Sequence, residues 1–104
     1  MSTLTERQAA FESKFAHDEQ LKFRVEMRRN RLVGLWAAAL LGKDDAEAYA
    51  KEVVAADFEE AGNEDVVRKI AADFQAAGLT QSADDVREKM AEILGEAVRQ
   101  VEAG

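Results

Sequence analysis

The stretch that decides the fold is residues 21–42, LKFRVEMRRNRLVGLWAAALLG. It contains no proline, and large apolar side chains recur along it densely enough to belong to a protein core. The interior Gly34 lowers helix propensity without ending a helix, whereas Gly42 is suited to the left-handed residue that closes one. Nothing interrupts the pattern back to about residue 5. The sequence therefore predicts one helix over residues 5–41, on the order of 55 Å long at 1.5 Å per residue.

Three further helices are expected over about residues 44–61, 64–77 and 83–102, with Gly62 and Gly78 as breaks. Their apolar residues recur every three or four positions, which is typical of helices with one buried face. Each would be roughly 20–30 Å long by the same rise, too short to cover a helix twice that length. We therefore predict an all-α fold, a four-helix bundle of residues 21–104 with a flexible or extended N-terminal arm of residues 1–20.

The arm has few residues with which to build a core of its own. Phe11 and Phe15 stand four positions apart, on one face of a helix. Two interpretations stay open: the rings fold back onto the bundle, or they anchor the arm in the groove of a partner.

Composition and charge exclude several classes of protein. The chain has 104 residues, 14 Lys and Arg against 21 Asp and Glu, a net charge of −7, one His and no Cys. Disulfides, cysteine-based metal sites and thiol nucleophiles are thereby excluded. The acidic balance argues against a nucleic-acid partner. The longest apolar run, residues 32–41, is too short for a bilayer, which needs about 20 residues, so we expect no membrane insertion.

Candidate sites are few. His17 has no metal or triad spacing around it, and a solvated residue is the default, with a pH switch as the alternative. No catalytic constellation is present, so we expect neither an enzyme nor a bound cofactor. A basic run within residues 22–31 is better explained by pairing with the acids of residues 43–104 than by an external anionic ligand. The external option is a nucleotide phosphate, with weak ATP or ADP binding, or an acidic protein groove; the candidate residues are Arg24, Arg28, Arg29 and Arg31.

Three blocks of sequence carry a resemblance. They are residues 11–19, FESKFAHDE; residues 23–38, FRVEMRRNRLVGLWAA; and residues 56–69, ADFEEAGNEDVVRK. In this order they resemble the zeta subunit of the alphaproteobacterial F-type ATP synthase, over nearly the whole chain, with a weaker match from Gln81 onward.

The resemblance implies a four-helix bundle with a mobile N-terminal segment that inhibits ATP hydrolysis. That segment would enter the catalytic head beside the rotor stalk and block hydrolytic rotation, as a mechanical wedge. It corresponds here to residues 1–19, and its matching block includes Phe11, Lys14, Phe15, Ala16 and His17. The implied partners are the catalytic head and the rotor stalk, and the implied location is cytoplasmic, peripheral to the inner membrane. A weak nucleotide-binding module and a general helical adaptor remain the alternatives.

Overall fold

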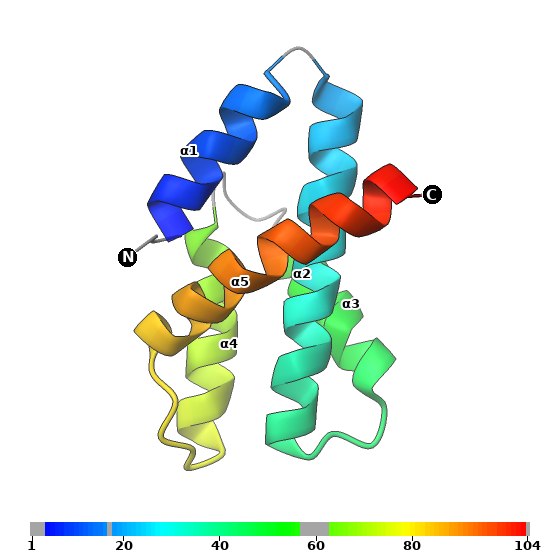
Figure 1. The fold of residues 1–104 in the computed structure, drawn as a ribbon. Helices are drawn as coiled ribbons and strands as arrows, with labels where there is room; N and C mark the ends of the chain where they lie inside the picture. The colour runs from blue at the N-terminus through cyan, green and yellow to red at the C-terminus, as the bar shows by residue number, and fades with distance from the viewer. Residues whose placement is uncertain (1–3, 17, 57–62, 104) are drawn as a thin grey trace.

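The computed structural model describes residues 4–16, 18–56 and 63–103, and within these it contains helices and no strands. The described residues form five helices: α1 (Leu4–Lys14), α2 (Glu19–Leu41), α3 (Ala46–Ala56), α4 (Glu64–Ala76) and α5 (Ala83–Ala103). In Figure 1, α1 and α2 diverge from a turn at the top, α5 crosses α2, and α3 and α4 lie below. The all-helical prediction is confirmed. The exact four-helix bundle is not, since the described chain has a fifth helix.

Helix α2 is the central element, and its two ends contribute to two separate hydrophobic clusters. Its C-terminal half packs with α3, α4 and the first half of α5 around Val33, Tyr49, Ile70 and Phe74. Its N-terminal half packs with α1 and the second half of α5 around Phe11, Phe15, Val25, Leu94 and Ala97. The second cluster therefore ties the N-terminal arm to the rest of the fold.

The prediction of one continuous helix over residues 5–41 is wrong, because the chain turns between α1 and α2. The Asp18 side chain accepts a hydrogen bond from the Leu21 backbone N–H at 2.9 Å, which starts a new helix. The Asp18 N–H in turn donates to the Phe15 carbonyl at 3.1 Å. This turn brings α1 back onto α5, where the aromatic rings of the arm are buried instead of extending into solvent.

The other helix ends agree more closely with the sequence. Gly42 and Gly78 have φ angles of 70° and 75°, as expected of glycines that close helices. Ser82 exchanges hydrogen bonds with Asp85, so it caps α5. Asn63 occupies the N-cap position of α4 but makes no capping hydrogen bond with its side chain. Gly62 lies outside the described residues.

A buried tyrosine joins α3 to α4. The Tyr49 hydroxyl donates to Asp73 Oδ2 at 2.7 Å, and Lys69 Nζ lies 3.0 Å from the same oxygen. Burial and this carboxylate raise the pKa of Tyr49. Burial alone would raise the pKa of Asp73, but hydrogen bonds from Tyr49 and Lys69 lower it overall. The network therefore holds an ionised carboxylate and a neutral phenol between the two helices.

Candidate functional site

The aromatic residues of the N-terminal arm lie against α5. Phe11 and Phe15 are 5% and 6% exposed, and their ring centroids are 5.1 Å apart in a tilted arrangement. Their spacing of four places both on the face of α1 that meets Leu94 and Ala97. Of the two interpretations left open by the sequence, folding back onto the bundle describes this structure.

Polar contacts at several points reinforce the attachment of α1. Gln8 accepts a hydrogen bond from Arg29 Nη1 at 3.0 Å and donates to Glu26 Oε1 at 3.2 Å. Arg7 donates to the Ala91 carbonyl at 3.4 Å. Lys14 Nζ lies 3.6 Å from Glu102 Oε1 in an exposed ion pair, which contributes at most about 1 kcal/mol. The arm is therefore held mainly by its two rings and by one part-buried amide.

The remaining residues of the expected inhibitory block are less engaged. Lys14 Nζ lies 5.2 Å from the centroid of the Phe15 ring. Ala16 is exposed in the turn between α1 and α2. His17 lies outside the described residues, so its role as a solvated residue or a pH switch stays a prediction.

The structure divides the candidate arginines into two groups. Arg29 is fully buried, and its guanidinium donates to Asn30 Oδ1 at 3.1 and 2.9 Å. A sequence signal for this existed: position 29 continues the i, i+4 row of Val25 and Val33, both fully buried. Arg29 therefore belongs to the interior of the fold and does not face the same surface as the other arginines.

The other three arginines do come together. They line a hollow of about 320 Å³ between α2, α3 and α5, whose lining residues are Arg24, Met27, Arg28, Arg31, Val54, Gln100 and Val101. Arg28 donates to Gln100 Oε1 at 3.0 Å, and Arg31 Nη2 lies 2.6 Å from Glu47 Oε1. The expected pairing with the acids of residues 43–104 thus holds for Arg31.

The sequence alone did not indicate which residues of α1, α3 and α5 lie beside the arginines of α2. Gln8, Val54 and Gln100 have no motif around them, and only the packing of separate helices brings them to the arginines. No group of three or more His, Cys, Asp or Glu side chains in the described part of the chain could hold a metal ion. None of the described helices is long and apolar enough to cross a membrane.

A family model described as ATPase inhibitor subunit zeta matches residues 1–100. The chain belongs to the ATPase inhibitor subunit zeta family. The match confirms the resemblance proposed from the sequence and extends it through the segment after Gln81, where the motifs alone were weak. No curated protein matches the chain.

Membership of the zeta family gives a coarse function. The chain is an ATPase inhibitor subunit, which implies interaction with ATP synthase. The family is described by inhibition and not by a reaction of its own, which agrees with the expectation of a non-catalytic protein. The match includes the whole N-terminal arm, so α1 is part of what defines the family.

Proposed function

We propose that residues 1–19 are the inhibitory segment of this subunit. They enter the catalytic head of ATP synthase beside the rotor stalk and block rotation in the hydrolytic direction. The protein would act at the cytoplasmic side of the inner membrane, as a peripheral subunit. The observation that carries the proposal is the amphipathic α1, whose two adjacent phenyl rings meet a hydrophobic surface in the free protein. The same face suits a hydrophobic groove in a partner.

Inhibition then requires α1 to separate from α5, because the rings cannot occupy two surfaces at once. Each buried phenyl contributes about 1.5–3 kcal/mol, while holding α1 in one position costs conformational entropy. When docking of α1 is favoured by a few kcal/mol in total, α1 is released from α5 in about 0.1–10% of the molecules. The apparent affinity for the ATPase falls to the same fraction of its intrinsic value, which is a loss of about 10- to 1,000-fold. Docking of α1 on α5 thus makes the free subunit a weaker inhibitor than its arm alone would be.

The first test removes the arm. Deletion of residues 1–19 is expected to abolish inhibition of ATP hydrolysis by purified ATP synthase, since both rings are lost. Circular dichroism of the truncated protein at the same concentration checks that α2–α5 remain helical. Full inhibition by the folded, truncated protein would refute the assignment of the arm.

A second test weakens the docking without changing the arm. Leu94 is 3% exposed beneath the rings, so Leu94→Ala is expected to release α1 more often and to lower the concentration needed for half-inhibition. Met90→Ala is the matched control, because Met90 lies one turn earlier on α5 in the other hydrophobic cluster. Phe15→Ala has the opposite expected effect, because it removes a ring that the partner would bind. If Leu94→Ala inhibited no better than Met90→Ala, release of α1 would not limit inhibition.

A further inference from the structure

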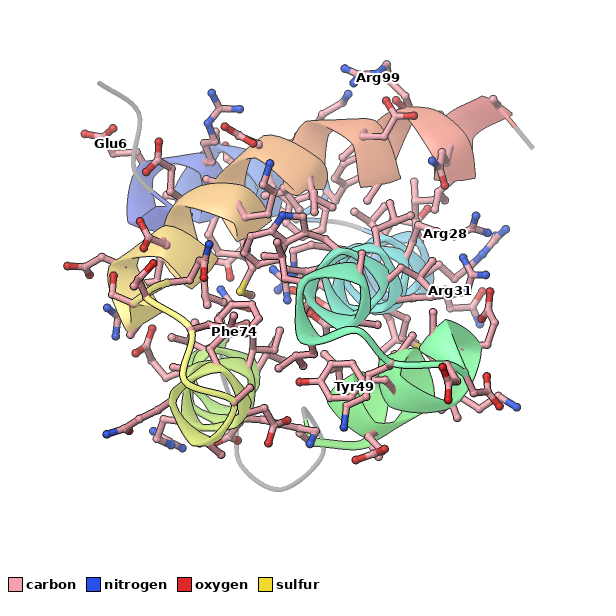
Figure 2. All side chains as sticks on the ribbon, turned by 90° about the horizontal axis from the view of Figure 1, so that it is seen from below. Glu6, Arg28, Arg31, Tyr49, Phe74 and Arg99 are labelled. Atoms are coloured by element: carbon pink, nitrogen blue, oxygen red, sulfur yellow. The ribbon has the colours of Figure 1, made fainter. Side chains whose placement is uncertain are left out.

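A second surface of the molecule has the form of a groove. The hollow lined by the arginines adjoins another of about 360 Å³ between α2 and α3, and the two share Met27, Arg31 and Val54. We call the two hollows together the α2–α3–α5 groove. Figure 2 shows Arg28 and Arg31 at one side of α2, with Glu6 of α1 at the opposite side of the molecule. The groove is not the docking site of α1, but the two surfaces adjoin at Val101, which lines the groove and also packs against the cluster that holds the rings of α1.

The floor of the groove is apolar, and its edges carry four basic side chains and one acidic side chain, that of Glu47. Met27, Ala50, Val54 and Val101 supply aliphatic side chains to the floor. Methionine adapts its shape to different partners, and such residues are common at peptide-binding surfaces. The basic residues at the edges are Arg24, Arg28 and Arg31 of α2 and Lys51 of α3. The groove thus combines the two features that an amphipathic, acidic segment would recognise.

Three of the four cations of the groove, Arg24, Arg28 and Lys51, differ from most others in the described chain by their lack of carboxylate partners, whereas Arg31 pairs with Glu47. Elsewhere basic side chains pair with acids, as Arg87 does with Glu64 and Lys89 with Glu92. Within the described residues, Arg24 and Lys51 make no hydrogen bond or ion pair, and the only hydrogen-bond partner of Arg28 is the neutral Gln100. The chain carries 21 acidic against 14 basic residues, so partners for these cations are not scarce. The unpaired cations leave a local positive field on an acidic protein, which attracts an acidic partner to this place.

The spacing of the arginines indicates the shape of the partner. Arg24, Arg28 and Arg31 lie on successive turns of α2, which spreads them over about 10 Å at 1.5 Å per residue. A single phosphate or carboxylate is held best by donors that converge on one point. A row of cations beside an apolar floor fits instead an amphipathic helix with an apolar stripe and acidic flanks.

We propose that the α2–α3–α5 groove docks an acidic amphipathic helix on the surface of the ATP synthase that the subunit inhibits. The choice of ATP synthase as the source of this helix rests on the proposed function. The groove holds the bundle to the enzyme while α1 is released from its own surface on α5. Two joined contacts raise the effective concentration of the arm at its own site, so the groove increases potency without taking part in the block.

The test uses the full-length chain and the purified catalytic head of ATP synthase from the same organism. The variant Arg24→Glu/Lys51→Glu reverses two cations that have no partner to lose in the described structure. The control Arg99→Glu/Lys89→Glu changes the net charge equally, at two positions of α5 that do not line the groove. Thermal unfolding and circular dichroism establish that both variants are folded.

The groove variant is expected to need about tenfold more protein for half-inhibition at low salt, with the same maximal inhibition because its arm is intact. The control variant is expected to match the wild type. Raising the salt from about 50 to 500 mM should shrink the difference between the wild type and the groove variant, since exposed charges are screened. Equal potency of the groove variant and the control would overturn the docking surface.

The outcome also separates this inference from the proposed function. Failure of the proposed function is seen as inhibition by the chain without residues 1–19, whatever the groove variant does. A small anionic ligand is tested by titrating the full-length chain with ATP alone and following backbone amides by NMR. Saturable shifts confined to amides around Arg24, Arg28 and Lys51 would overturn the helix as occupant in favour of a nucleotide.

Discussion

Replacing Gly34 with alanine is expected to destabilise the protein, whereas the same change at Gly95 is expected to stabilise it. Both glycines lie inside long helices, Gly34 in α2 and Gly95 in α5. In either helix interior, alanine is favoured over glycine by about 0.8–1 kcal/mol. The two sites differ in what the added methyl group would contact, so the pair isolates the effect of helix packing.

The contacts set the expected magnitudes. A Cβ on Gly34 would lie 2.9 Å from Ala50 Cα and 3.3 Å from Val53 Cβ, whereas at Gly95 the nearest atom is Arg99 Nη1 at 3.8 Å. Carbon atoms pack best at about 3.5–4.0 Å, and a backbone Cα cannot move by changing rotamer, so α3 must shift away from α2. Overpacking of this kind typically costs about 1–3 kcal/mol, which outweighs the gain in helix propensity. The Gly95→Ala variant gains the higher helix propensity of alanine and has no overpacking to offset it.

Urea unfolding followed by circular dichroism at 222 nm measures both variants against the wild type. The unfolding free energies of the two variants are expected to differ by about 1–3 kcal/mol, and a difference of 1 kcal/mol corresponds to about 4–8 °C in Tm for a domain of this size. Gly34→Ala protein as stable as Gly95→Ala protein would refute the close approach of α2 and α3. An unchanged m-value confirms that both changes act on the folded state.

Three further predictions concern the turn before α2 and the network between α3 and α4. Asp18→Ala removes the capping side chain and should cost about 1 kcal/mol in thermal unfolding, whereas Asp44→Ala, at an exposed residue that makes no hydrogen bond in the described structure, should cost little. Tyr49→Phe removes the 2.7 Å hydrogen bond to Asp73 and should cost about 1–2 kcal/mol in urea unfolding; an unchanged stability would contradict the bond. The hydrogen bonds from Tyr49 and Lys69 outweigh burial and lower the pKa of Asp73, so its stabilisation is present above the unfolded pKa of about 3.9 and is lost as the pH falls through the folded value. The stability difference between the wild type and Asp73→Asn should therefore be constant above about pH 5 and shrink toward pH 2; a difference that grew with acid would reverse the sign of this argument.

If the arm inhibits as proposed, its docked position on α5 would regulate inhibition. The rings of Phe11 and Phe15 are sequestered on α5, so any factor that loosens the second hydrophobic cluster raises the fraction of released arm. Val101 packs at the edge of that cluster and also lines the α2–α3–α5 groove. Under the proposed function, a partner bound in the groove would lie next to the surface that α1 leaves.

Much of the secondary structure could be predicted from local pattern. The periodic apolar stripes located α4 and α5 to within a residue or two, and glycine's freedom to adopt positive φ located the ends of α2 and α4. The continuous first helix was the main error. Residues 5–41 contain no helix-breaking residue, and the side chain of Asp18 starts α2 only because the chain gains burial of Phe11 and Phe15 by turning back.

The sequence by itself determined the all-helical class, the exclusion of disulfides and cysteine-based sites, and the family, because composition, periodicity and motif order are local properties of the chain. Only the tertiary structure decided where the charged and aromatic residues point. It buried Arg29 while leaving Arg24 and Arg28 on a groove, and it placed the rings of the arm on α5. The physical reason is that burial depends on which helices meet, and contacts between helices distant in sequence leave no periodic signal in any one of them.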